Sequence, residues 1–529
     1  MKEIFTRNLK ELSGFNPAAK AYLNGALNEF ISYAPDLKGY ERALSERMKR
    51  DVNRDVLVRV LKNQNRDAGD KTKYNIELLG NENTFTVTTG HQLCLFTGPL
   101  FFIYKIVHAI KLSEELKRNF PSDNFVPVYW MASEDHDFAE VNHAFVFGKK
   151  VEWQNVAAGA VGRMSLDSFH VVLEEVKTIL GDSDSAKEIF SVLANCYSEK
   201  NLAEATRKLV NYLFAEYGLV VLNADDHQLK SLFKETMKKE LTGSFVMPAV
   251  KQQSELLEAK GLKIQVKPRE INLFYLATDL RERITKEGNV YYTADKSKSW
   301  TEKEILYELN DHPENFSPNV LMRAMYQETI LPNITYVGGA GEISYWLQMK
   351  RMFETAGIFF PVLTVRNSYF LMNTGQSEKW KSLGFKYSDL FKKEEDLIKE
   401  FISENADSEI DFTKEKKELK TIYEVVSDKL AKADATLRAS GEAEYQKAVK
   451  SIEMLEGKIR KAEKQKHEQS INQIKQIKGK LFPEGEWQER RDNFLGYRMK
   501  NDNFLKELNE SFTLNMKIDS NLSLVNYDS

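Results

Sequence analysis

Between Asn83 and about Arg366 the sequence alternates short apolar runs, rich in β-branched and aromatic residues, with amphipathic stretches of helical spacing. Continuous apolar strands that alternate with helices are typical of a mostly parallel sheet, because helices cover such strands on both faces. The alternation therefore predicts an α/β fold with a parallel-sheet core.

Each apolar run ends at a cluster of small or polar residues. The five clusters begin at Gly90, Ser133, Asp225, Gly338 and Arg366. In open parallel sheets, ligands bind outside the carboxyl ends of the strands, where loops from different strands meet. The clusters therefore predict one ligand site that is built from distant segments of the chain.

The segments around the core differ in pattern. Residues 1–80 place apolar residues at helical spacing and predict a helical lead-in. Residues 81–242 and 313–390 are expected to form the two parts of the core. Residues 243–312 interrupt the alternation and predict an inserted small β-containing connecting domain, and we expect residues 483–529 to pack back on the core.

Residues 391–482 predict a coiled-coil helical arm. Within 411–480 the chain carries 12 acidic and 17 basic side chains, and its apolar residues recur at 3-4 spacing. The segment Ala439-Ser-Gly441 is expected near the tip of a helical hairpin. Such an arm often pairs with a second copy, so we expect a homodimer.

Charge and cysteine content narrow the class of protein. The formal net charge is −3 at pH 7, and the two cysteines, Cys94 and Cys196, are too few for a disulfide framework or a cysteine-based zinc site. No apolar run reaches transmembrane length, and the first residues lack the apolar core of a signal peptide. We expect a cytoplasmic protein with neither membrane nor nucleic-acid partners.

The first cluster joins an expected strand to an apolar helix through two Thr-Gly pairs, which contain Gly90 and Gly98. Glycine permits close backbone approach, and amides at a helix N-terminus attract anions. We therefore predict that Gly90 and Gly98 bind an anion or a nucleotide. The predicted substrate-binding residues in this segment are His91, Gln92, Thr97 and Lys105.

The second cluster, Glu134-Asp-His-Asp137, puts three carboxylates and an imidazole directly after an apolar strand. Burying such a cluster without ligands would be costly, so Glu134, Asp135, His136 and Asp137 are the catalytic candidates. They could act as a general base for an amine, bind a sugar or hold a metal. Because no further histidine motif completes a ligand set, no metal is predicted, and Asn142 is assigned to substrate binding.

The cluster at Gly338 resembles a glycine-rich turn into a helix, which suits a phosphate or carboxylate group. Gly338, Gly339, Gly341 and Glu342 are therefore predicted to bind an anion or a nucleotide. Flanking arginines could hold carboxylates through paired hydrogen bonds. The substrate-binding candidates around this turn are Arg323, Tyr345, Trp346 and Arg366.

Several of these motifs together resemble the cysteine ligase family of bacillithiol biosynthesis, and they follow one another in order along almost the whole chain. They are Thr89-Gly-His-Gln with Thr97-Gly-Pro-Leu, Pro127-Val-Tyr-Trp with Glu134-Asp-His-Asp-Phe-Ala-Glu-Val-Asn142, Leu331-Pro-Asn with Tyr336-Val-Gly-Gly-Ala-Gly-Glu-Ile-Ser-Tyr-Trp346, and Leu481-Phe-Pro with Gln488-Glu-Arg490.

The resemblance implies a Rossmann-like core with inserted connecting domains and a long C-terminal coiled coil. It also implies a ligase that adds L-cysteine to the amine of glucosaminyl malate as the last step toward bacillithiol, and a site for ATP or ADP. Two alternatives remain open. One is a class I nucleotidyltransferase-like enzyme that activates another carboxylic acid, and the other is a non-catalytic dimeric scaffold that uses the coiled coil.

Overall fold

The computed structural model describes residues 1–156, 159–406, 411–514 and 520–527. It contains two compact units, one formed by Met1–Leu371 with Gln488–Ser529 and the other by Met372–Trp487. Within the described ranges, no helix combines the length and the apolar character needed to cross a membrane.

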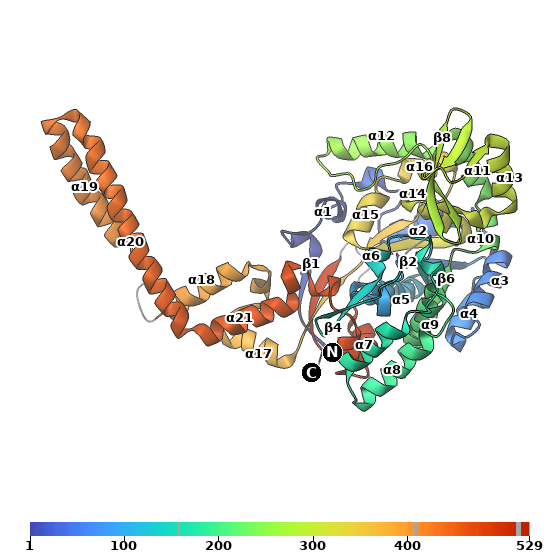
Figure 1. Ribbon diagram of the computed structural model, residues 1–529, viewed down its shortest axis with the longest axis horizontal. Helices are drawn as coiled ribbons and strands as arrows, with labels where there is room; N and C mark the ends of the chain where they lie inside the picture. The colour runs from blue at the N-terminus through green and yellow to red at the C-terminus, as the bar shows by residue number, and fades with distance from the viewer. Residues whose placement is uncertain (157–158, 407–410, 515–519, 528–529) are drawn as a thin grey trace. The chain divides into compact units, whose positions relative to one another are not determined.

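A five-stranded parallel sheet forms the centre of the first unit (Figure 1). The strand order is β13-β12-β2-β3-β6, and every pairing is parallel. All of β12 and nearly all of β2 are buried, as strands covered on both faces must be. The predicted parallel-sheet core is therefore confirmed. Its strands are β2 (Thr84–His91), β3 (Asn124–Met131), β6 (Val220–Asn223), β12 (Asn333–Gly338) and β13 (Val362–Val365).

The strand order locates the crevice of the sheet. The chain adds β3 and β6 on one side of β2, and then returns to add β12 and β13 on the other side. This is a Rossmann-like, doubly wound arrangement. Loops leave β2 and β12 in opposite directions, and ligands bind in the crevice that opens at such a switch point.

Helices pack against the sheet through apolar clusters. Helices α2 (Leu37–Arg47) and α5 (Phe101–Asn119) share one cluster with residues of β2 and β12. Helices α3 (Arg54–Gln64) and α9 (Leu202–Phe214) contact the edge strand β6. The other helices of this unit that matter for the site or the lead-in are α1 (Pro17–Leu23), α4 (Asp70–Leu78), α6 (Phe138–Val141), α7 (His170–Leu180), α8 (Asp184–Cys196), α10 (His227–Ser231), α14 (Val320–Ile330), α15 (Ala340–Trp346) and α16 (Lys350–Ala356).

The first eighty residues contain α1 to α4 but begin with a strand. Strand β1 (Lys2–Asn8) pairs antiparallel with β15 (Asn521–Asn526), which lies beside β14 (Ser368–Met372). The local pattern predicts helices only, because the partner that makes β1 a strand lies at the opposite end of the chain. This pairing brings the C-terminal segment into the first unit.

A second, antiparallel sheet of order β10-β9-β8-β7-β11 lies in the segment that interrupts the core. Its last strand lies past residue 312, where the insertion was expected to end. Helices α11 (Lys234–Gly243), α12 (Val246–Ala259) and α13 (Glu302–Asp311) belong to the same region. The strands are β7 (Leu273–Ala277), β8 (Leu280–Glu287), β9 (Val290–Thr293), β10 (Ser299–Thr301) and β11 (Phe316–Pro318). A separate hairpin joins β4 (His143–Val146) and β5 (Lys149–Glu152).

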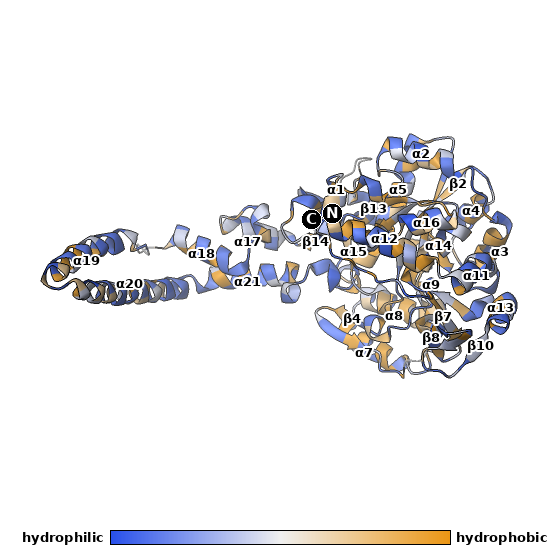
Figure 2. Ribbon diagram, turned by 90° about the horizontal axis from the view of Figure 1, so that it is seen from above, coloured by the Kyte–Doolittle hydropathy of each residue, from blue (hydrophilic) through white to orange (hydrophobic). Residues whose placement is uncertain are grey.

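The second unit is helical and contains the predicted coiled coil. Helices α19 (Thr413–Ala433) and α20 (Arg438–Lys466) form an antiparallel hairpin, and hydrophilic residues cover much of both (Figures 1 and 2). The turn lies at Ala435–Leu437, so the expected segment 439–441 is near the tip but lies inside α20 and does not break the helix. The other helices are α17 (Thr374–Ser382), α18 (Glu394–Asn405) and α21 (Glu468–Leu481).

Candidate functional site

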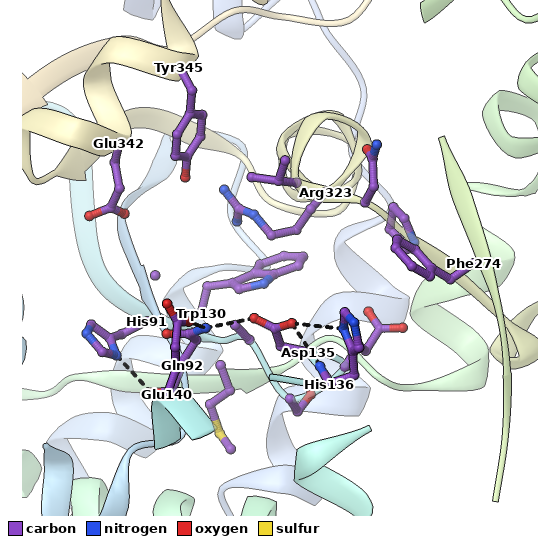
Figure 3. Close-up of a pocket in the computed structure, with 18 of the residues that line it drawn as sticks. His91, Gln92, Trp130, Asp135, His136, Glu140, Phe274, Arg323, Glu342 and Tyr345 are labelled. Carbon is purple, nitrogen blue, oxygen red and sulfur yellow. Dashed lines mark hydrogen bonds and ion pairs between the residues drawn. The ribbon is translucent and has the colours of Figure 1, made fainter. Parts of the chain in front are cut away.

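A cavity of about 700 Å³ opens at the carboxyl ends of β2, β3 and β12, at the switch point of the parallel sheet. Three of the predicted clusters meet there, represented by His91 at the end of β2, Asp135 after β3 and Glu342 after β12 (Figure 3). Further lining residues come from β3, β12, α5, α6, α14, α15 and the antiparallel sheet. Distant loops therefore build one site.

One wall of the cavity is rich in hydrogen-bond acceptors. Gln92 Nε2 donates to Asp135 Oδ2 at 2.8 Å and also to the Glu140 carboxylate (Figure 3). Burial alone would raise the pKa of the Asp135 carboxyl, but the Gln92 hydrogen bond and the charge of Arg281 outweigh burial and lower it. Asp135 is therefore ionised at neutral pH and can accept hydrogen bonds from an amine or a hydroxyl.

The antiparallel sheet completes this wall. Arg281 of β8 donates from Nη1 to His136 Nδ1 at 2.8 Å, and its guanidinium carbon lies 3.9 Å from the ring centroid of Phe274 on β7. Because a guanidinium can only donate, His136 Nδ1 acts as an acceptor and carries no proton in this arrangement. The inserted strands thus hold the His136 ring at the rim.

Glu134 has a buried counter-ion. It forms an ion pair with Lys230, whose Nζ also donates to the carbonyl of Phe316 at 2.8 Å. Behind this pair, Arg163 binds Asp225 through two hydrogen bonds of 2.7 Å. The Glu134 charge is therefore compensated inside the protein. The Asp225 carboxylate, one of the three acidic or histidine side chains after β6, is likewise used for an internal contact.

The glycine-rich turn after β12 differs from the prediction. Glu342 reaches back so that its Oε1 accepts the Gly339 N–H at 3.0 Å, and its other oxygen accepts from Tyr336 at 2.6 Å. Lys105 Nζ lies 2.5 Å from Glu342 Oε1 and also donates to the Gly90 carbonyl at 2.8 Å. Despite burial, the charge of Lys105 lowers the pKa of Glu342. A carboxylate of the protein thus occupies the place predicted for a ligand anion.

Arg323 from α14 is the contrasting cation of the cavity. Its guanidinium lies over the rings of Trp130 and Tyr336, with its carbon 5.6 Å from each centroid. Nη1 donates to Gln327 Oε1 at 3.0 Å, and within the described part of the chain Nη2 has no hydrogen-bond partner. Figure 3 shows this guanidinium within the cavity, in the region of Tyr345. It suits the recognition of a carboxylate.

His91 lines the cavity between aromatic rings. Its ring centroid lies 5.0 Å from that of Phe101, and its Nδ1 lies 2.9 Å from the Gln92 carbonyl oxygen. Burial, together with the charge of Lys105, lowers the pKa of His91 to about 3. The imidazole is therefore neutral at neutral pH and can serve in hydrogen bonding but not as a counter-ion.

Part of the first predicted cluster lies outside the cavity lining. Thr97 is buried and, like Gly98, has a positive φ, in a tight turn where a Cβ on Gly98 would lie 2.5 Å from Cys94 Cβ. Asn493 clamps the turn by donating to the carbonyls of Phe96 and Gly98 at 2.7 Å each. Gly98 is therefore needed for backbone packing, and Thr97 does not reach the cavity.

Two predicted substrate-binding residues have partners elsewhere in the fold. Arg366 is buried and binds Glu489 through Nη1 at 3.0 Å and Nη2 at 2.6 Å. Trp346 is fully buried and stacks on Tyr336, with 4.8 Å between ring centroids. Neither residue lines the cavity, because the charge of the first is already matched and the ring of the second belongs to the core.

The remaining predicted residues outside the lining serve local structure. Asp137 caps α6 by accepting the Glu140 N–H at 3.3 Å, and Asn142 donates to Glu152 at 3.4 Å. Gly338 ends β12, and Gly341 lies exposed in α15. The predicted residues that do line the cavity are Gly90, His91, Gln92, Lys105, Glu134, Asp135, His136, Arg323, Glu342 and Tyr345.

Sequence reasoning missed the lining residues Phe274 and Arg281, and it missed Lys230, the counter-ion of Glu134. The first two lie in the insertion, whose folding over the sheet edge has no local signal. Glu342 as a helix cap was visible, because a glutamate three residues after the N-cap position is the spacing of a capping box.

Comparison with known proteins covers both units. Residues 7–367 match the family model described as "Bacillithiol biosynthesis BshC, N-terminal Rossmann-like domain", and residues 369–517 match the corresponding "C-terminal coiled-coil domain". Relatives named "Putative cysteine ligase BshC" include one from Flavobacterium johnsoniae, 41% identical over 92% of this chain and 93% of its own length. Others are from Cytophaga hutchinsonii, 41% identical over 92% of both chains, and Chlorobaculum tepidum, 32% identical over 87% of both.

Proposed function

Because the chain belongs to the BshC family of bacillithiol biosynthesis, we propose that it is a ligase that forms an amide between L-cysteine and the amine of glucosaminyl malate. We place this reaction as the last step toward bacillithiol. The proposal assigns both small molecules to the cavity at the switch point of the parallel sheet.

One observation carries the proposal: an acceptor-rich wall and two cations without a carboxylate partner line the same cavity. Arg323 donates to Gln327, and Arg281 donates to His136 and Ser317. Among the described residues neither arginine forms an ion pair. Glucosaminyl malate carries hydroxyls and an amine at one end and two carboxylates at the other. Its charges therefore complement the cavity.

The acceptor-rich wall supports the chemistry at nitrogen. Only the free amine can attack a carbonyl, since an ammonium has no lone pair. Asp135, with Glu134 and His136 beside it, would bind the ammonium and help to remove its proton. The nitrogen then bonds to the activated cysteine carbonyl, and the leaving group departs with the bonding electron pair.

The cysteine carboxyl must be activated before this attack, and ATP is the predicted co-substrate. The two glycine turns do not fit a phosphate as they stand, because Glu342 accepts the Gly339 N–H and also pairs with Lys105, the cation beside Gly90. Neither turn is therefore proposed as the nucleotide site.

The test is to incubate the purified protein with L-cysteine, glucosaminyl malate, ATP and a thiol reductant. Mass spectrometry should find a product equal to the sum of the two substrates less one water. A strain that lacks the gene should accumulate glucosaminyl malate. If both substrates remain unconsumed, and if the deletion leaves the thiol pool unchanged, the proposed reaction is wrong.

A further inference from the structure

A chain of buried polar side chains leads away from the cavity behind Arg323. Gln327 Nε2 donates to Glu328 Oε1 at 2.8 Å, and Asn333 Nδ2 donates to the same oxygen at 2.8 Å. The oxygen of Asn333 in turn accepts from the hydroxyls of Thr86 and Thr88 on β2. The chain therefore ties the cavity arginine to the centre of the sheet.

Arg323 and Glu328 fix the orientation of the Gln327 amide that lies between them. A guanidinium can only donate hydrogen bonds, and an ionised carboxylate can only accept them. The amide must then turn its oxygen to Arg323 and its nitrogen to Glu328, as observed. Exchange of the two amide atoms would place N–H against N–H at the arginine.

A buried carboxyl group at position 328 would lower the stability of the protein if its role were only structural. It is 1% exposed, and among the described residues its Oε2 has no hydrogen-bond partner. The charged groups that face it are Arg47 from α2 and Arg323 from α14, and neither makes an ion pair with it. A buried carboxylate without a close counter-ion lowers stability, so packing alone does not explain a glutamate at this position.

We propose that Glu328 is a positioning residue, which fixes the Gln327 amide and thereby holds the Arg323 guanidinium in place for a substrate carboxylate. The inference rests on the proposed function for the identity of that substrate. It adds a specificity determinant that lies behind the cavity wall and touches no ligand.

The protonation state of Glu328 distinguishes a positioning role from a packing role, because a packing role would not depend on pH near 7. Burial raises the pKa of Glu328 to about 7. Among the described residues Oε2 has no partner, so it can take up the proton, and Oε1 then remains an acceptor without the negative charge. A hydrogen bond to a neutral acceptor is weaker than one to a carboxylate, so protonation loosens the hold of Glu328 on the Gln327 amide. The contribution of Glu328 to substrate binding is therefore present above pH 7 and lost below it.

The kinetic experiment compares the wild type with Glu328→Gln and Gln327→Leu at pH 6, 7 and 8. At pH 8 both variants should raise KM for glucosaminyl malate about tenfold, the scale of one hydrogen bond to a charged group, and leave KM for cysteine unchanged. For Glu328→Gln the ratio to wild type should approach one at pH 6. The matched control is Thr329→Val, at the neighbouring position, whose hydroxyl donates to the Met325 carbonyl inside α14.

A second measurement does not depend on the substrate. Crystal structures of the wild type and both variants should show Arg323 Nη1 within hydrogen-bond distance of residue 327 in the wild type only. The positioning role would be overturned if Arg323 did not move in the variants. It would also be overturned if the ratio of KM for glucosaminyl malate between Glu328→Gln and the wild type were the same at every pH. Should the wild type fail to use glucosaminyl malate, the proposed function falls, and the position of Arg323 still decides this inference.

Discussion

The carboxylates of the cavity differ in what balances their charge. Glu134 is paired with Lys230 and Glu342 with Lys105, so an internal lysine neutralises each of them. Asp135 is instead held by the neutral amide of Gln92 and by the more distant charge of Arg281. Among these three, Asp135 therefore has the most electrostatic attraction left for a substrate ammonium.

Replacing Asp135 tests this difference. Asp135→Asn keeps the shape of the side chain but removes the charge, and we expect kcat/KM to fall by about 100-fold, the lower range for loss of a general base. Steady-state kinetics with both substrates measures the effect. Asp137→Asn is the control, because Asp137 caps α6 outside the cavity and asparagine is an equally good cap. Equal losses in both variants would contradict the assignment.

Glu328 also predicts how stability depends on pH. Its pKa is about 7 in the folded protein and 4.5 without perturbation, so the folded state binds the proton more tightly. Protonation of Glu328 therefore stabilises the folded state. This contribution is complete below pH 4.5 and is lost as the pH rises through 7, which lowers the free energy of unfolding by about 3 kcal/mol. Relative to the wild type, Glu328→Gln should therefore gain in unfolding free energy between pH 5 and pH 8. Thermal or urea unfolding at several pH values measures this gain, and a constant difference would contradict it.

At the scale of elements, the strands β7 and β8 bring side chains of the insertion to a site that belongs to the parallel sheet. Phe274 pairs in register with Arg283, and Arg281 is its diagonal neighbour on β8. The Phe274 ring lies against the Arg281 guanidinium, which contacts His136. The insertion therefore contributes to the chemistry of the site in addition to covering it.

We expect Arg281→Gln to raise KM for glucosaminyl malate about tenfold, because the cavity loses one of two cations without a carboxylate partner. Arg283→Gln is the matched control, since Arg283 lies on the same strand, is exposed and does not line the cavity. Steady-state measurement of KM for each substrate in both variants tests this difference. An unchanged KM in Arg281→Gln would remove this residue from the site.

The hairpin of α19 and α20 depends on one close approach. A Cβ at Gly441 would lie 3.2 Å from Ser427 Cα and would collide with the Ser427 hydroxyl, whereas a Cβ at Gly457 would meet nothing within 4 Å. We expect Gly441→Ala to destabilise the helical unit by about 1–3 kcal/mol and Gly457→Ala to stabilise it by about 1 kcal/mol. Thermal unfolding followed by circular dichroism measures both. A stabilising Gly441→Ala would show that the helices do not pack this closely.

The sequence predicts elements better than the contacts between them. The apolar runs that end at Gly90, Ser133 and Gly338 correspond to β2, β3 and β12, because burial on both faces leaves a continuous apolar signal. The pairing of β1 with β15 has no such signal, since its two strands are at opposite ends of the chain. The partner of Arg366 could not be predicted for the same reason, because the buried Glu489 that pairs with it is distant in the sequence.

At the scale of the whole molecule, the cavity lies entirely within the unit formed by Met1–Leu371 and Gln488–Ser529. The chemistry proposed here therefore needs no side chain of the helical unit. Exposed apolar residues on α19 and α20, such as Ile422, Val425 and Met454, fit the expected homodimer, which stays a prediction. Loss of dimerisation should leave the binding of glucosaminyl malate intact.

The central claim is that loops from three parallel strands form the pocket that binds the carboxylated sugar. A crystal structure of the protein with glucosaminyl malate tests it most directly. We expect a malate carboxylate to contact Arg323 and the sugar amine to lie within hydrogen-bond distance of Asp135. Ligand density at any other place, with this cavity left unoccupied, would contradict the account.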